Sequence, residues 1–329
     1  MKGAFLMRVR FGVFADLHVD IMHDCESRLR VFLDACRDAD VDFIVQLGDF
    51  CYPDEDRKCY CQPDKRPVNI QNAMDYPTYA DKDTILSLYR DFEKPSYHVI
   101  GNHDLDMCSK EQMMAYYGNM TSPYYSFDCG GVHFVALDCN YCKVDGKYIP
   151  YDNGIYFDWS YDTPRPLPYL PPEQLRWLDD DLSRTELPSV LFSHQMLRAP
   201  DLKNADELAP ILRKHNVILS ANGHHHKDNV TRIGSTWFWN VNSMSNYWLD
   251  VPYATLRYTP QLDVRYPNIR YVAPYRDPVF AIVTITDGVI DIRGRKSVFV
   301  GPSPAEQGFP MKSWEDIVSP SVTDFSLRF

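Results

Sequence analysis

Five short apolar segments of this chain lead directly into aspartate, asparagine or histidine, and no other feature constrains the fold as much. Short apolar runs bounded by turn residues are typical of buried β-strands. In open α/β sheets, ligands bind at the carboxyl ends of the strands, so we expect these polar side chains to share one edge. The apolar segments and their polar ends are Phe14-Ala15 before Asp16-Leu17-His18, Val45-Gln46-Leu47 before Gly48-Asp49, Val99-Ile100 before Gly101-Asn102-His103-Asp104, Leu191-Phe192-Ser193 before His194, and Ile218-Leu219-Ser220 before Gly223-His224-His225-His226.

Helical patterns alternate with apolar runs through the first two thirds of the chain, which predicts a layered α/β architecture. The last third changes character, because two apolar runs flank Asp287-Gly288 and predict a hairpin there. The predicted strands are 9–15, 43–47, 97–100, 131–137 (paired with 124–127 as a hairpin), 190–192, 217–219, 280–285 and 289–292, and the predicted helices are 25–40, 81–92, 172–182 and 206–215.

The 329 residues contain no linker that would divide the chain, so we predict a single domain over residues 1–300. Two polar inserts, at about 51–80 and 143–172, are rich in proline and tyrosine. Long inserts of this kind often form the rim or the lid of a site. The segment 301–329 is rich in proline and serine and is predicted to be a C-terminal surface tail.

The formal net charge of −11 argues against long nucleic acids and anionic membranes as partners, because their phosphate groups would be repelled. A small phosphorylated substrate fits only if something local and positive receives it. No stretch reaches the roughly 20 apolar residues of a membrane span. The nine cysteines are scattered along the chain, and the apolar run near the first residues is too short for a secretory signal. We therefore predict a cytoplasmic protein, or a periplasmic or secreted one if a signal was removed. Nothing in the sequence indicates the oligomeric state.

Seven residues at the strand ends carry side chains that bind metals, and imidazole with carboxylate suits Zn, Mn, Fe or Ni better than Mg or Ca alone. Asp16 and His18 lie two residues apart on a predicted extended segment, so both side chains are expected to point the same way. The same spacing separates His224 from His226. Seven ligands are too many for one ion and favour two divalent ions, roughly 3.5–4 Å apart, that share a carboxylate. The seven residues are Asp16, His18, Asp49, Asn102, His194, His224 and His226.

The order of these motifs resembles that of the calcineurin-like metallophosphoesterase superfamily. The family pattern is Asp-x-His, Gly-Asp-x-x, Gly-Asn-His-(Asp/Glu), a lone His and Gly-His-x-His, and every part is present from Asp16 to His226. The resemblance implies a four-layer αββα sandwich, with two mixed β-sheets flanked by helices. It also implies one metal ion on Asp16, His18 and His226, a second on Asn102, His194 and His224, and Asp49 as the bridge.

Two motif residues are predicted to act in catalysis instead of metal binding. Two divalent ions would lower the pKa of a bridging water, so that hydroxide exists at neutral pH and attacks the phosphorus. His103 is not a ligand in the family, and as an imidazolium it would stabilise the developing charge or protonate the leaving oxygen. Asp104 is predicted to orient His103 and to favour its charged form, with a turn or cap residue as the alternative.

Three further residues are predicted to contact the substrate. In the purple acid phosphatase branch, a tyrosine spaced like Tyr52 binds ferric iron, but that branch lacks a histidine at the position of His18. Tyr52 is therefore predicted to form a wall of the cleft, and the Asp-x-His and Gly-Asn-His-Asp forms resemble the cyclic-nucleotide phosphodiesterase branch more closely. Asn240 and Asn242 follow a strand and are predicted to face the cleft. One or two of the aromatic residues between 237 and 248 are candidates to stack on a nucleobase or aryl leaving group.

The motifs together predict a two-metal phosphohydrolase that acts on small phosphodiesters or phosphomonoesters. An alternative is hydrolysis of a nucleotide pyrophosphate, such as a nucleoside diphosphate sugar or alcohol. A third hypothesis is a metal-bearing scaffold without activity, which predicts the loss of ligands or of His103, and the sequence has lost none of them.

Overall fold

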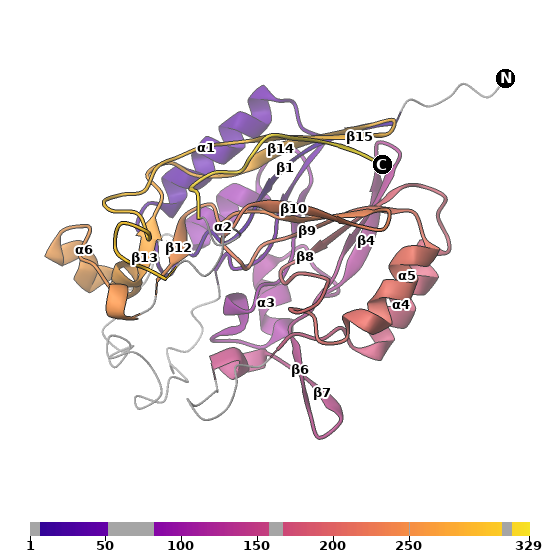
Figure 1. The fold of residues 1–329 in the computed structure, drawn as a ribbon, viewed down its shortest axis with the longest axis horizontal. Coiled ribbons are helices and arrows are strands. Elements are labelled where there is room, and N and C mark those ends of the chain that lie inside the picture. The colour runs from indigo at the N-terminus through magenta and orange to yellow at the C-terminus, as the bar shows by residue number, and fades with distance from the viewer. Residues whose placement is uncertain (1–6, 52–81, 158–166, 250, 311–317) are drawn as a thin grey trace.

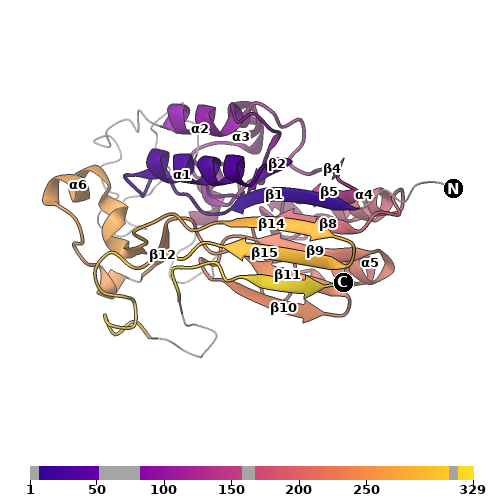
Figure 2. The same cartoon turned by 90° about the horizontal axis from the view of Figure 1, so that it is seen from above.

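Two six-stranded β-sheets lie face to face in the computed structural model, and helices cover both outer faces (Figure 1). Figure 2 shows the layers from above, with α1 and α2 on one side of the paired sheets. The structure describes residues 7–51, 82–157, 167–249, 251–310 and 318–329. This arrangement is the four-layer αββα sandwich expected from the sequence, and the predicted fold class is confirmed.

The first sheet combines a parallel part with an antiparallel part, in the order β16-β15-β14-β1-β2-β3. β1, β2 and β3 run parallel, whereas β14 pairs antiparallel with both β1 and β15. The carboxyl ends of β1 and β2 therefore reach the same edge. The strand bounds are β1 Arg8–Phe14, β2 Phe43–Gln46, β3 Ser96–His98, β14 Ala281–Thr286, β15 Val289–Gly294 and β16 Phe325–Arg328.

The second sheet has the order β10-β11-β9-β8-β5-β4, and its four central strands are parallel. The strand at each edge of this sheet pairs antiparallel with its neighbour. Two small two-stranded sheets, β6 with β7 and β12 with β13, lie outside the main layers. The bounds are β4 Tyr125–Cys129, β5 Val132–Ala136, β6 Tyr141–Val144, β7 Lys147–Pro150, β8 Ser189–Ser193, β9 Val217–Asn222, β10 Asn229–Ile233, β11 Thr236–Asn240, β12 Asn246–Trp248 and β13 Val272–Pro274.

The helices divide between the two outer faces. Apolar side chains of α1, α2 and α3 pack on the first sheet, and those of α4 and α5 pack on the second. Among the described residues, no helix is long and apolar enough to cross a membrane. The bounds are α1 Cys25–Asp38, α2 Lys82–Arg90, α3 Lys110–Tyr117, α4 Pro172–Leu182, α5 Ala205–Lys214 and α6 Pro260–Arg265, with 3-10 turns η3 His103–Leu105, η4 Asp152–Phe157, η5 Val251–Tyr253 and η6 Pro267–Tyr271.

An aromatic cluster joins the two sheets. Phe11 of β1 stacks on Phe43 of β2 with ring centroids 5.0 Å apart. The ring of Phe11 also makes edge-to-face contacts with Phe134 and Phe192, with ring centroids 5.6 Å and 5.8 Å apart. Both of these residues belong to the second sheet. All four rings are buried, so the cluster fixes the position of one sheet on the other.

The structure corrects one boundary drawn from the sequence. The predicted surface tail instead ends in β16, which pairs with β15 and forms the edge of the first sheet. Val322 and Leu327 are buried there, because the edge strand adds its apolar side chains to the core between the sheets. The second insert contains the β6–β7 hairpin and η4, while the first lies almost entirely outside the described residues.

We expect Phe11→Ala to lower the free energy of unfolding by about 3–5 kcal/mol, because it removes a fully buried ring between two sheets. Val144→Ala is the control, since Val144 is 53% exposed and its truncation should change stability by less than about 0.5 kcal/mol. Urea denaturation with a metal chelator present measures both, because bound metal would stabilise only the folded state. Equal stabilities of the two variants would contradict this role of the aromatic cluster.

Candidate metal centre

The candidate ligands lie on backbone that L-residues rarely adopt. The structure contradicts the expectation that Asp16 and His18 lie on an extended segment, because both have left-handed conformations with φ of 54° and 53°. Asp and His tolerate this region better than most residues, and strained backbone of this kind clusters at functional sites. The candidate ligands with positive φ are Asp16, His18, Asp49, His224 and His226.

Glycines allow the ligand-bearing loops to approach one another. A Cβ at Gly101 would collide with the backbone and the carboxylate of Asp49. A Cβ at Gly48, where φ is +95°, would lie 2.5 Å from Nδ1 of His194. The loops after β2, β3 and β8 therefore pack together only because two of these positions carry no side chain.

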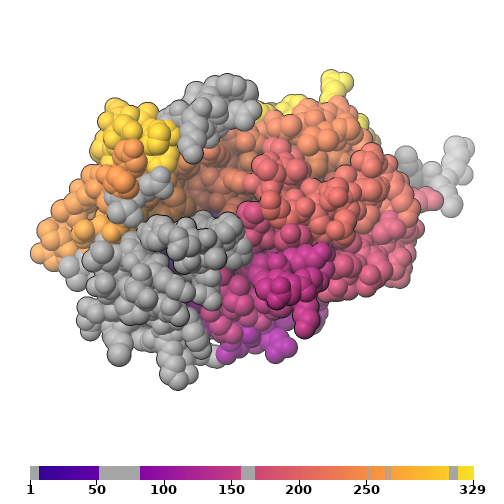
Figure 3. Space-filling view, turned by 60° about the horizontal axis from the view of Figure 1, so that its bottom comes forward, coloured from indigo at the N-terminus to yellow at the C-terminus, as the bar shows by residue number. Residues whose placement is uncertain are grey.

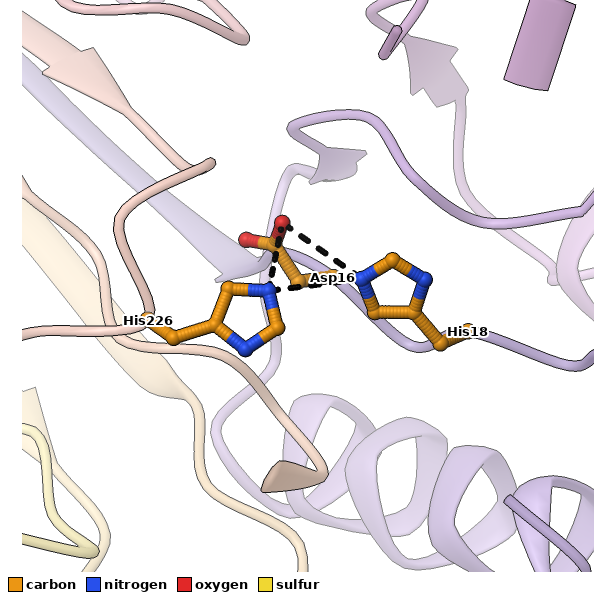
Figure 4. Close-up of side chains that lie close together, drawn as sticks. All are labelled: Asp16, His18 and His226. Atoms are coloured by element: carbon orange, nitrogen blue, oxygen red, sulfur yellow. Dashed lines mark hydrogen bonds and ion pairs between the residues drawn. The ribbon is translucent and has the colours of Figure 1, made fainter. Parts of the chain in front are cut away.

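The first group of candidate ligands is formed by Asp16, His18 and His226 (Figure 4). Nε2 of His226 lies 3.3 Å from Oδ1 of Asp16 and 3.3 Å from Nε2 of His18. Nε2 of His18 is 4.0 Å from the same Asp16 oxygen. One donor atom from each residue thus points into the same small space, and all three side chains are buried.

The second group consists of Asp49, His194 and His224. Nε2 of His194 lies 3.1 Å from Oδ2 of Asp49 and 3.3 Å from Nδ1 of His224. Burial lowers the pKa of His224 well below its ordinary value, and positive charge on His194 acts in the same direction. His224 is therefore a neutral imidazole, which is the form that binds metals.

Hydrogen bonds on the far side of two rings fix which nitrogen carries the proton. Nδ1 of His226 lies 2.7 Å from the carbonyl of Asn246, and Nδ1 of His194 lies 2.8 Å from the carbonyl of Leu47. A carbonyl oxygen can only accept, so each Nδ1 donates, and each ring in its neutral form carries its lone pair at Nε2. These lone pairs point into the two groups, as they do in histidines that hold metals.

Asp49 connects the two groups. Its Oδ2 lies 3.1 Å from Nε2 of His194 and 3.8 Å from Nε2 of His18. Its Oδ1 accepts the backbone N–H of His103 at 2.8 Å. Burial alone would raise the pKa of Asp49, but His194, His103 and His18 hold it well below its ordinary value, so the carboxylate stays ionised.

Asn102 fits the donor set for a different reason. Its side chain is fully buried, yet within the described part of the chain neither the amide oxygen nor the amide nitrogen has a hydrogen-bond partner. An unsatisfied buried amide is costly, and a cation bound at the oxygen would satisfy it. The donor set of imidazole, carboxylate and amide oxygen therefore fits transition-metal ions.

The sequence-based pairing of His103 with Asp104 is wrong. Nδ1 of His103 lies 3.0 Å from Oδ2 of Asp106, which the short turn η3 places on the same side three residues later. Burial would lower the pKa of His103, but the carboxylates of Asp106 and Asp49 raise it to about 9. The sequence gives a local signal for this pairing, since residues three apart in a turn face one another.

Asp104 instead binds the backbone of two ligand loops. Its Oδ1 accepts the N–H of Phe50 at 2.8 Å, and its Oδ2 accepts the N–H groups of Asp49 at 3.1 Å and Gly101 at 2.7 Å. Burial and the neighbouring Asp49 raise the pKa of Asp104 to about 7, and the N–H donors act against that shift. Asp104 thus holds the loop of Asp49 against the loop of Asn102.

A buried network of polar side chains supports the same loops. Nδ2 of Asn140 donates to the carbonyl of Ile100 at 2.8 Å, just before the Gly-Asn-His-Asp motif. Oδ1 of Asn140 accepts from Nε2 of Gln195 at 2.7 Å, just after the lone histidine. Asp138 accepts from Asn140 at 2.9 Å and forms a buried ion pair with Lys110. None of these four side chains belongs to the metal-binding motifs, and their partners come together only in the folded chain.

The residues predicted to contact substrate have other positions. The structure contradicts the expectation for Asn242, whose Nδ2 donates to the carbonyls of Ser319 and Ser321 and whose Oδ1 accepts from Tyr275. Asn240 is buried in β11, and its Nδ2 lies 3.2 Å from Oδ1 of Asn229. Tyr52 lies outside the described residues.

A family model for calcineurin-like phosphoesterases matches residues 9–228, which is more than half of the chain. The chain belongs to the calcineurin-like phosphoesterase family. The resemblance noted in the sequence is therefore confirmed, and so is the assignment of the chain to the metal-dependent phosphoesterases. The match covers the whole of the segment from Asp16 to His226 that carries the candidate ligands.

Solved structures show the same calcineurin-like fold. A dimetal phosphatase from Danio rerio superposes with a TM-score of 0.55 at 16% identity, covering 90% of this chain and 99% of the other. GAP50, the anchor in the inner membrane complex of Plasmodium, superposes with a TM-score of 0.51 at 14% identity, covering 98% of this chain and 89% of the other. A search of curated proteins gave no match.

We expect Asp104→Asn to weaken metal binding by about 10–100-fold, the usual cost of losing a group that supports ligands. An amide keeps only one acceptor oxygen and turns its NH₂ toward an N–H donor on the other side, so at least one of the three backbone contacts is lost and the loops are held less firmly. Metal content after dialysis, measured by elemental analysis, checks this result. Asp106→Asn is the matched control, because Asp106 contacts His103, and it should keep its metal. If both variants retain metal equally, Asp104 does not position the ligand loops.

Proposed function

We propose that this protein is a two-metal phosphohydrolase that cleaves small phosphodiesters or phosphomonoesters. The observation that carries the proposal is the position of Asp49 Oδ2, 3.1 Å from Nε2 of His194 and 3.8 Å from Nε2 of His18. One carboxylate oxygen that faces both donor groups suits a ligand shared by two ions about 3.5–4 Å apart.

The proposed ligands follow the two groups described above, with Asn102 added to the second. When bound, two divalent ions would supply positive charge to the phosphoryl oxygens and would make a water molecule more acidic. Mn, Fe, Zn and Ni all accept this mixture of nitrogen and oxygen donors. Asp16, His18 and His226 would hold one ion, Asn102, His194 and His224 the other, and Asp49 both.

His103 is proposed as the residue that gives a proton to the leaving oxygen. Its side chain is 18% exposed, in contrast to the fully buried Asn102 beside it, so it can reach a bound substrate. Asp106 accepts from Nδ1, which leaves Nε2 of the imidazolium as the proton donor. In this proposal Asp104 is a positioning residue for the loops, and Asp106 takes the orienting role.

We expect Asn102→Ala and His224→Ala each to lower hydrolysis of bis(p-nitrophenyl) phosphate by about 100-fold or more, because each removes a proposed ligand. The assay uses protein loaded with Mn or Zn, and released nitrophenolate is measured by absorbance. His225→Ala is the matched control, because Nε2 of His225 lies 3.1 Å from Asp201 and His225 belongs to neither candidate ligand group. It should keep activity within about threefold of wild type. Equal activity of all three variants would contradict the site.

A panel of substrates separates this proposal from its alternatives. Faster turnover of nucleoside diphosphate sugars than of aryl mono- and diesters would favour a nucleotide pyrophosphatase. Loaded metal with no turnover of any phosphoester would favour a non-catalytic scaffold and would overturn the proposal.

A further inference from the structure

A tryptophan ring lies beside the candidate metal centre. Trp248 ends β12 and is half-buried. Its ring centroid is 5.7 Å from that of His18, 6.2 Å from that of His103 and 6.3 Å from that of His226. The carbonyl that orients His226 belongs to Asn246 on the same short strand, so β12 positions the ligand and the tryptophan together.

A second ring lies on the other donor group. The ring of Tyr156, from η4, is 5.5 Å from His103 and 6.3 Å from His224. Trp248 thus contacts the first group, Tyr156 contacts the second, and His103 contacts both rings. Figure 3 shows a hollowed surface among the orange residues on this face of the molecule.

Carboxylates dominate the described charges around His103. Asp106 lies 3.0 Å from Nδ1 of His103, and Asp49 accepts its backbone N–H. Asp20 is 22% exposed and lies 3.8 Å from Nδ1 of His18, a neighbour of His103. A leaving group that carried a further phosphate would meet these carboxylates and be repelled, whereas a neutral ring would not.

We propose that Trp248, beside His103, receives the leaving group of the substrate, and that the preferred substrates are phosphate esters with a neutral aromatic leaving group, such as an aryl or nucleoside ester. This inference rests on the proposed function, because His103 must protonate the leaving oxygen as its bond to phosphorus breaks. The departing group then lies next to His103, against the ring of Trp248. Base–aromatic stacking tolerates many ring types, so the site selects a class of substrate and not one compound.

A purely structural role for Trp248 makes a different prediction. If the ring only supports His18 and His226, its removal weakens every substrate alike. If it receives the leaving group, its removal weakens aromatic ligands selectively. Affinities for a matched pair of non-hydrolysable probes therefore separate the two roles without depending on turnover.

The experiment measures binding of phenylphosphonate and methylphosphonate to Mn-loaded protein by calorimetry. Trp248→Ala should weaken phenylphosphonate by about 10-fold and methylphosphonate by less than about twofold. Trp248→Phe keeps an aromatic ring, so its affinity for phenylphosphonate should stay within about threefold of wild type. This variant replaces the alanine variant in the test if the alanine variant fails to fold. Trp177→Ala is the control, because Trp177 on α4 is also half-buried and packs on Tyr124 with centroids 4.9 Å apart.

Equal weakening of both probes, or of neither, in Trp248→Ala would overturn the assignment of the leaving-group site. Turnover then repeats the comparison with phenyl phosphate and ethyl phosphate, where the variant should raise KM for the phenyl ester only. Wild-type protein that binds Mn and both phosphonates but hydrolyses neither ester contradicts the proposed function. Selective loss of phenylphosphonate binding would still support the aromatic subsite in that case, so the two failures are distinguishable.

Discussion

Asp49 is the residue on which the candidate site depends, because its carboxylate faces both donor groups. Each group combines residues from both sheets: Asp16 and His18 follow β1 and meet His226 from beyond β9, while Asp49 follows β2 and meets His194 from β8. The distances within each group are therefore set by how one sheet packs on the other. The aromatic cluster between the sheets has a functional consequence, since a shift of one sheet would separate the ligands.

Such a site is costly to fold without a cation. It gathers carboxylates, imidazole lone pairs and an unsatisfied amide in a buried space, and it holds five residues in left-handed backbone. The surrounding structure offsets this cost. Asp104 binds three backbone N–H groups of two loops, and Asn140 joins the segments before Asn102 and after His194. The charged and polar groups outside the ligand set thus make a strained geometry persist.

The sequence predicts which side chains meet at the sheet edge, because their placement follows from local rules: a buried strand ends, and the next side chains lie at that edge. It fails where two partners compete or are remote. Asp104 and Asp106 are both close to His103 in sequence, and only the geometry of η3 places Asp106 on the ring. β16 pairs with β15 across about 30 residues that carry no strand pattern. Asn242 looked like a cleft residue, yet that same C-terminal segment occupies its amide.

The net charge of −11 says little about the substrate, because the charge that matters is local. The candidate ligands would concentrate the charge of two cations at one point, which attracts a phosphoryl group despite the acidic surface. Around His103 the sign reverses, since Asp106 and Asp20 are carboxylates. These groups favour the protonated form of His103 and disfavour a second phosphate in the same place. In the proposed mechanism, proton donation and the choice of leaving group depend on the same charges, so a substitution that alters one should alter the other.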